Sequence, residues 1–183
     1  MFETLKPAPA DAILGLITEH KNDPRPDKVD LGVGVFRTAA GETPVLDVVK
    51  KAEQLLVDTQ ESKAYIGTAG DPNFNAAMQD LMFGQSADNS RVLTIQAPGG
   101  SGSMRVAASL ILQARPDAKL WVSDPTWANH MPLLGGAGLQ LESYPYYDTA
   151  THTLKIDQML DALTKMPVGD LVLLHACCHN PSG

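Results

Sequence analysis

Two helix starts stand out in the pattern of apolar and polar positions along the first half of the chain. Thr43 as N-cap and Pro44 as first helical residue precede apolar residues that recur at helical spacing. Asp71 and Pro72 repeat this signal, and Gly84 stands where a glycine commonly ends a helix. The pattern therefore predicts two helices with a glycine-rich loop between them.

The chain before these helices divides into an arm, a short helix and a short strand. Residues 1–10 contain two prolines and no periodicity, whereas the apolar residues of 13–17 suit one helix face. An apolar run at 29–35 predicts a strand. Gly32 and Gly34 within that run indicate close approach of another backbone or of a ligand.

From residue 91 onward, short apolar runs alternate with helical patterns. We expect strands at 92–97, 120–122, 139–144 and 171–175, and helices at 104–114 and 156–164. Such alternation is typical of βαβ units, and hence of a mostly parallel sheet with helices on its faces. The predicted class is α/β. The chain ends at 180–183, shortly beyond a buried-type strand, where a doubly wound domain would continue, so we expect an incomplete domain.

Composition narrows the choice of partners and compartment. With 183 residues, 44% of them hydrophobic, the chain can bury a sizeable core. A net charge of -7, with scattered Lys and Arg, argues against nucleic acid or an anionic membrane as partner. We find neither an export signal nor a run of about 18 apolar residues. Two adjacent cysteines, Cys177 and Cys178, lack zinc or redox spacing, so a reduced cytoplasmic protein is expected.

The strongest chemical signal is the glycine-rich segment 97–103 between a predicted strand and a helix. Free amides and the hydroxyls of Ser101 and Ser103 at a helix N-terminus suit a phosphate dianion. A tight turn that needs glycine is the plain structural alternative. A dinucleotide site is a further alternative, because Asp124 follows the next strand, although Arg105 stands where G-x-G-x-x-G requires glycine.

Two more loops follow predicted strands, and ligands in an open parallel sheet gather at such strand ends. Trp127 could stack on a flat ring, or it could be a core anchor with His130 as a satisfied helix residue. Asn180 precedes a proline, which leaves its amide for a ligand or for a local turn. His175 and His179 beside two cysteines raise the alternative of a metal, but all four lie within five residues, and we expect none.

Together these segments resemble the class I pyridoxal-phosphate-dependent aminotransferases of the aspartate and aromatic amino-acid subfamily. The matching motifs occur in order along the whole chain: Pro9 to Leu14, Leu31 to Val35, Thr43 to Val45, Lys63 to Gly67, Pro98 to Gly102, Trp121 to Trp127 and His175 to Gly183. The resemblance implies the N-terminal portion of a fold-type I transferase. Residues 1–40 would form an arm, short helix and strand of the small domain, and residues 41–183 the first part of the cofactor-binding large domain.

The resemblance also implies roles for single residues. Ser101, Gly102 and Ser103 match the segment that cups the cofactor phosphate, and Tyr65 matches a residue that reaches the phosphate held by the partner subunit of a homodimer. A second set matches the ring and the substrate: Trp127 stacks on the pyridine ring, Asn180 bonds its phenolic oxygen, Gly34 lies beside the substrate carboxylate, and His130 and His175 support the carboxylate that faces the pyridine nitrogen.

What the resemblance leaves out bears on catalysis. The family's Schiff-base lysine and its substrate-binding arginines match no residue of this chain, so we expect no catalytic residue here and no activity from residues 1–183 alone. Ser182 replaces a threonine of the family's Asn-Pro-Thr-Gly motif. The implied function of the longer protein is transfer of an amino group between an aspartate-like or aromatic amino acid and a 2-oxo acid. A nucleotide-binding Rossmann domain and a non-catalytic truncated domain are the alternatives.

Overall fold

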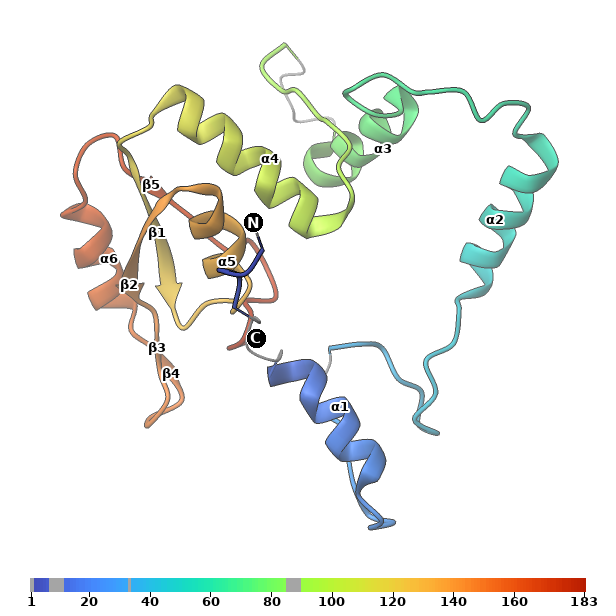
Figure 1. Cartoon of the computed structure of the whole chain (residues 1–183), viewed down its shortest axis with the longest axis horizontal. Helices are drawn as coiled ribbons and strands as arrows, with labels where there is room; N and C mark the ends of the chain where they lie inside the picture. The colour runs from blue at the N-terminus through green and yellow to red at the C-terminus, as the bar shows by residue number, and fades with distance from the viewer. Residues whose placement is uncertain (1, 7–11, 33, 85–89) are drawn as a thin grey trace. The chain divides into compact units, whose positions relative to one another are not determined.

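The structure, a computed structural model, describes residues 2–6, 12–32, 34–84 and 90–183. Contacts between residues group the chain into two parts, Met1–Ala64 and Tyr65–Gly183 (Figure 1). The predicted domain boundary at residue 40 stays a prediction. Half of the predicted arm, and the first residues of the first matching motif, lie outside the described residues.

The first part contains α1 (Ala12–Asn22) and α2 (Asp47–Thr59). α1 confirms the first predicted helix. It ends just before Pro24, and the ammonium group of Lys28 donates to the carbonyls of His20, at 2.6 Å, and Asp23, at 2.7 Å. The last carbonyls of a helix have no partner within it, so these bonds satisfy groups that would otherwise depend on water.

The predicted start of α2 is wrong by three residues. Leu46 is the N-cap, and its carbonyl accepts from the amides of Val49 at 3.0 Å and Lys50 at 3.2 Å. Thr43 and Pro44 lie before it, in neither helix nor strand. Asp47 as first helical residue places a carboxylate at the positive end of the helix dipole, which favours this later start.

The second part begins with a helix whose predicted signals are confirmed, α3 (Pro72–Phe83). The carboxylate of Asp71 accepts from the amides of Asn73, at 2.8 Å, and Phe74, at 2.9 Å. Gly84 ends the helix with a φ of 57°. Both ends of α3 therefore follow from residues that the sequence identifies.

A parallel sheet of three strands organises the remainder, which confirms the α/β class. β1 (Lys119–Asp124) is central, with β2 (Gln140–Pro145) on one side and β5 (Leu171–Val172) on the other. The connecting helices are α4 (Gly99–Ala114), α5 (His130–Leu134) and α6 (Ile156–Thr164), with a 3₁₀ turn at Gly135–Ala137. A hairpin of β3 (Tyr147–Asp148) and β4 (Thr153–Leu154) was not predicted, because strands of two residues show no alternation.

Two predicted strands are wrong in the part of the chain that the structure describes. The runs at 29–35 and 92–97 form neither helix nor strand in the described residues and pair with no strand there, residue 33 lying outside the description. Apolar sequence favours an extended backbone, but a strand also needs a hydrogen-bonded neighbour, which one segment cannot specify. The predicted strand at 171–175 is also shorter, since only Leu171 and Val172 pair as β5.

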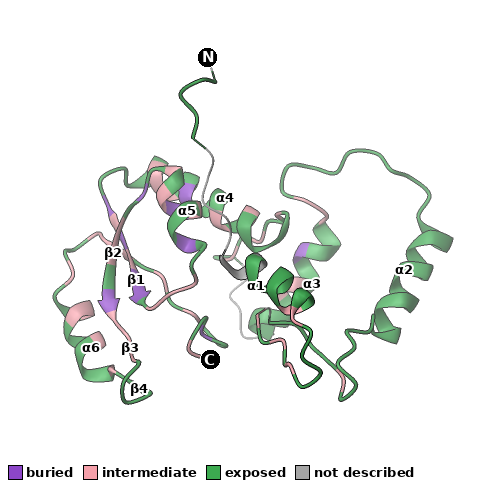
Figure 2. Cartoon of the chain, turned by 60° about the horizontal axis from the view of Figure 1, so that its bottom comes forward, coloured by how far each residue is buried: buried purple, intermediate pink, exposed green. Residues whose placement is uncertain are grey.

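The core lies between α4, β1 and α5. Its buried residues are Ala108, Leu120, Leu134 and Leu139, and partly buried side chains of β2 and the β5 segment pack on them. Figure 2 shows burial concentrated in these elements, whereas α2 has no buried residue. None of the helices in the described ranges has both the length and the apolar character needed to cross a membrane.

Candidate functional site

The glycine-rich segment forms the start of α4. Gly99 has a φ of 65°, and its amide donates to the carbonyl of Ala97 at 2.8 Å, which turns the chain into the helix. Pro98 is the N-cap and supplies no side-chain hydrogen bond. The first amides of a helix carry partial positive charge and need an acceptor. A cap without an acceptor side chain therefore leaves this helix start suited to an anion.

Gly102 is required by close packing at this turn. A Cβ added to Gly102 would lie 2.7 Å from Cδ and Cγ of Pro98, nearer than side chains approach one another. Ser101 is exposed on the same turn. The hydroxyl of Ser103 donates to the carbonyl of Gly99 at 2.9 Å, so it braces the first turn. Ser101 therefore offers the hydroxyl that is free to face an anion beside the amides.

The loop that begins at Tyr65 lies against the glycine-rich segment. The amide of Gln96 donates to the carbonyl of Ala69 at 2.9 Å, and the Gln96 side-chain oxygen accepts from the amide of Asp71 at 2.9 Å. A shallow hollow of about 340 Å³ between them is lined by Ile66, Gly67, Thr68, Gly70, Gln96, Ala97 and Pro98. Tyr65 itself is fully exposed, at 106%. Sequence reasoning gave Gln96 no role, because one glutamine in an apolar run carries no motif.

Residues at the end of β1 bring Trp127 and two predicted histidines together. Trp127 meets the ring of His130 edge-on, with centroids 5.2 Å apart, and His130 meets His175 in the same way at 5.3 Å. The hydroxyl of Thr126 lies 2.9 Å from Nδ1 of His130 and 3.5 Å from Nε2 of His175. The structure thus joins the loop after β1 to the segment after β5, as expected for neighbouring parallel strands.

His179 is the residue of this cluster to which sequence reasoning gave only the metal alternative. Its ring stacks on His175 at 4.2 Å and on Tyr146 at 4.1 Å. Its nitrogens lie 2.8 Å from the hydroxyl of Ser123 and 2.8 Å from that of Ser182. Serine and threonine both carry a hydroxyl group, and at position 182 this hydroxyl bonds the ring of His179. Three histidines following two adjacent strands are the signal that could have identified the cluster.

His130 and His179 favour their neutral form. Burial lowers the pKa of His130, and the neighbouring His175 and His179 lower that pKa further. Burial also lowers the pKa of His179, with a second contribution from His175. A positive charge on either ring is unfavourable, because the ring would lose its hydration and would lie beside another imidazole. Within the described residues, no three His, Cys, Asp or Glu side chains gather in a way that could hold a metal ion.

Asn180 and Asp124 are exposed residues of the two segments that carry the histidine cluster. The amide nitrogen of the Asn180 backbone donates to Nδ1 of His175 at 3.2 Å, and the residue is exposed. Asp124 ends β1, is also exposed, and uses its carbonyl to accept from the amide of Tyr146 at 3.2 Å. Ser101, Gly102, Trp127 and Asn180 thus belong to one α/β part of the chain.

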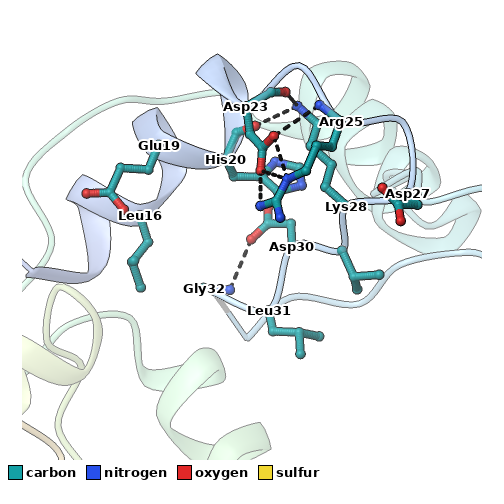
Figure 3. Close-up of a pocket in the computed structure, with 11 residues that line it drawn as sticks. Leu16, Glu19, His20, Asp23, Arg25, Asp27, Lys28, Asp30, Leu31 and Gly32 are labelled. Atoms are coloured by element: carbon teal, nitrogen blue, oxygen red, sulfur yellow. Dashed lines mark hydrogen bonds and ion pairs between the residues drawn. The ribbon is translucent and has the colours of Figure 1, made fainter.

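Gly34 belongs to the first part, where charged residues surround a hollow of about 500 Å³ (Figure 3). Arg25 pairs with Asp23 there, and Asp30 accepts from the amide of Gly32 at 3.0 Å and from Arg37 at 2.7 Å. Arg25 holds the pKa of Asp23 below its usual value. These bonds pair Arg25 and Arg37 with neighbouring carboxylates. Nothing in the hollow indicates a second site.

Comparison with known proteins gives the family. The model of the family "Aminotransferase class I and II" matches residues 26–183. The chain is 44% identical over 186 aligned positions to an aspartate aminotransferase of Escherichia coli strain K12, covering 100% of the chain and 47% of that protein. It is 45% identical over 185 positions to an aromatic-amino-acid aminotransferase of Pseudomonas aeruginosa, covering 100% and 46%. The chain belongs to the class I and II aminotransferases.

A solved structure agrees with this assignment. An aromatic-amino-acid aminotransferase of Burkholderia pseudomallei, covalently bound to pyridoxal phosphate, superposes with a TM-score of 0.93 at 40% identity, covering 99% of this chain and 46% of that one. The chain spans about half the length of the relatives it matches. The family membership confirms the resemblance and decides against the dinucleotide-binding alternative.

Proposed function

We propose that the complete protein containing this chain is an aminotransferase that uses pyridoxal 5'-phosphate. Its substrates would be an aspartate-like or aromatic amino acid and a 2-oxo acid, the classes for which its relatives are named. One observation carries the proposal. A helix start with no capping side chain, a partly exposed tryptophan at a strand end and an exposed asparagine occur in one α/β part of a chain of this family.

The chemistry of these residues fits the cofactor. The first amides of α4 and the hydroxyl of Ser101 can donate to a phosphate dianion. Trp127 offers an indole face to a flat ring, and Asn180 offers an amide donor to a phenolate oxygen. Pyridoxal phosphate, when bound, supplies an electron-withdrawing ring that stabilises negative charge on the α-carbon of an amino acid. In this proposal the chain holds and orients; it does not itself move the proton.

His130 and His175 support this arrangement. Thr126 holds both rings, and His130 fixes the edge of Trp127. Because burial lowers the pKa of His130, its ring is neutral and can bond the hydroxyl of Thr126 at 2.9 Å while it lies edge-on to Trp127. We assign His130 and His175 as residues that orient the ring-binding side chains. Gly34 is proposed to lie beside the substrate carboxylate, and a cytoplasmic location stays a prediction.

We further propose a homodimer in which Tyr65 reaches the phosphate site of the partner subunit. Tyr65 is fully exposed, yet the loop that it begins is tied to the glycine-rich segment through Gln96. A phenol held on an anchored loop and left in solvent suits a contact across a two-fold axis. Sedimentation of the complete protein should give a dimer, and a fully active monomer would contradict the shared site.

The function is tested with the complete protein loaded with pyridoxal phosphate. We expect amino transfer to 2-oxoglutarate from aspartate, from phenylalanine or from both, followed as glutamate. Asn180→Ala should lower turnover about ten-fold or more, as expected for the loss of a hydrogen bond to a charged group. Asn73→Ala, which changes an exposed asparagine of α3, is the matched control and should leave turnover unchanged. A wild-type protein that binds no pyridoxal phosphate and transfers no amino group would contradict the proposal.

A further inference from the structure

His179 is buried although its neighbours on both sides are exposed. Its residue exposure is 6%, whereas Cys178 and Asn180 lie at the surface. Neither the family's named site residues nor the proposed function gives this side chain a role. A polar ring that is buried at a strand end is expected to be fully bonded, because an unpaired buried nitrogen is costly.

The hydrogen bonds of His179 join β1 to the turn that carries Asn180. Nε2 lies 2.8 Å from the hydroxyl of Ser123, which is itself 1% exposed and one residue from the end of β1. Nδ1 lies 2.8 Å from the hydroxyl of Ser182. The carbonyl of His179 accepts from the amide of Gly183 at 2.6 Å, which closes the turn around Asn180. Since hydroxyls both donate and accept, either neutral tautomer satisfies this pair of bonds.

The ring of His179 also supports the residue that holds Asn180 by its backbone. His179 lies between Tyr146 and His175, with interplanar angles of 20° and 25°. His175 in turn accepts the Asn180 amide, at 3.2 Å. Two contacts therefore link Asn180 to His179. The backbone bond from Gly183 to His179 closes the turn around Asn180, and the His179 ring stacks on His175, which accepts the Asn180 amide.

The titratable groups that face His179 do not compensate a charge on it. They are His175 on one face and Tyr146 on the other, with His130 close enough to interact electrostatically, and Ser123 and Ser182 at its edges are neutral. Burial, with His175 adding to it, lowers the pKa of His179. A neutral ring keeps one acceptor nitrogen, so the two serine bonds can persist across the neutral pH range.

We propose that His179 is a positioning residue: its imidazole locks the Asn180 turn to the end of β1, so that the Asn180 amide meets the ring of bound pyridoxal phosphate in one orientation. This inference rests on the proposed function for its consequence in catalysis. The positioning of the Asn180 turn by His179 does not depend on the proposed function, so the two hypotheses can be tested separately.

The first test uses the complete protein loaded with pyridoxal phosphate and three variants. His179→Leu removes both bonds, while His179→Gln and His179→Asn each keep an amide that can reach one of the serines. His152→Asn, which changes the exposed histidine of the β3–β4 hairpin, is the matched control. The readouts are kcat, KM and the pH midpoint of the visible absorbance of the bound cofactor.

A misplaced Asn180 would donate less well to the cofactor oxygen, which would disfavour the deprotonated form of the chromophore. We expect His179→Leu to raise the midpoint by about half a pH unit or more, since one unit corresponds to a full ten-fold change in equilibrium. The kcat should fall about ten-fold, as for two neutral buried hydrogen bonds lost, while KM changes less. At least one of His179→Gln and His179→Asn should keep most of the wild-type kcat and a pH midpoint near that of the wild type. Unchanged midpoints in all three variants, with only a lower melting temperature, would overturn the proposal.

A second test reads the turn without cofactor or turnover. In the NMR spectrum of the complete apoprotein, His179 should remain neutral to a lower pH than a free histidine, and His179→Leu should shift the backbone amide signal of Asn180. An Asn180 signal unaffected by His179→Leu overturns the inference whatever the activity. If instead the signal moves but the wild type neither binds cofactor nor transaminates, the positioning stands and the proposed function fails.

Discussion

The backbone amide of Gln96 donates to the carbonyl of Ala69 across 2.9 Å, and this bond holds the Tyr65 loop against the glycine-rich segment. Gly70, which follows Ala69, makes the approach possible. Its φ is 91°, and a Cβ added to it would lie 2.2 Å from Cβ of Gln96. A side chain at this position would therefore force the two segments apart.

Gly70→Ala should lower the free energy of unfolding of the complete protein by about 1–3 kcal/mol, as a strained backbone position with a steric clash does. It should also weaken binding of pyridoxal phosphate, because the Tyr65 loop moves. Urea denaturation and cofactor titration measure the two effects. Gly67→Ala lies in the same loop with open space around its Cβ and is the control. Equal stability of the two variants would be inconsistent with the close approach.

Gly102→Ala should affect the cofactor more than the fold. The added methyl group would meet Pro98 and displace the first turn of α4, where the phosphate is proposed to bind. We expect the dissociation constant for pyridoxal phosphate to rise about ten-fold or more, the cost of one misdirected hydrogen bond to a charged group. Equilibrium dialysis measures it. Gly136→Ala, in the 3₁₀ turn and free of close neighbours, should bind as the wild type does. A Gly102→Ala protein with unchanged affinity would place the phosphate elsewhere.

Stability should fall as the pH is lowered through the histidine range. The pKa values of His130 and His179 lie below the ordinary value of 6.5 in the folded protein. Between 6.5 and those lowered values the unfolded chain binds protons that the folded chain does not, so acid favours unfolding. At neutral pH both states are deprotonated and these groups have no effect.

Urea denaturation of the complete protein between pH 7 and 5 measures this slope. His179→Gln should reduce the loss of stability on acidification, whereas His152→Asn should keep it. The carboxylates with lowered pKa, such as Asp170 held by the Trp121 indole, lose their contribution only at a lower pH. A variant without His179 that loses as much stability as the wild type over this range would contradict the assignment.

Residues 1–183 alone should not transaminate. The chemistry needs an amine nucleophile and a general base beside the cofactor, and no lysine of this chain matches the family's Schiff-base lysine. The purified chain would be mixed with pyridoxal phosphate, aspartate and 2-oxoglutarate, and glutamate formation compared with that of free pyridoxal phosphate. Turnover well above the free cofactor that a lysine substitution abolishes would mean that a lysine of this chain does the chemistry.

Local signals in the sequence predicted some elements fully and others only in part. Asp71 and Gly84 bound α3 because caps act through their own backbone neighbours. The start of α2 was misplaced, since Pro44 is as compatible with extended chain as with a first helical turn. The run at 92–97 was predicted as a strand because its sequence favours an extended backbone. Strand pairing also depends on a neighbouring strand, which the sequence of the run does not specify.

The candidate site divides in the same way. The sequence pointed to Trp127, His130 and His175 separately, and the structure joins them through Thr126. Two partners of His179, Ser123 and Tyr146, come from β1 and the β2–β3 connection, and these contacts become visible only once the strands are adjacent. The roles assigned to these residues toward the cofactor stay predictions.

The most direct test of the central claim is a crystal structure of the complete protein with pyridoxal phosphate. We predict the phosphate within hydrogen-bonding distance of the first-turn amides of α4 and of Ser101. We also predict the ring on the face of Trp127, with the Asn180 amide at the phenolic oxygen. A phosphate bound away from the α4 N-terminus, or a ring in contact with neither Trp127 nor Asn180, would contradict it.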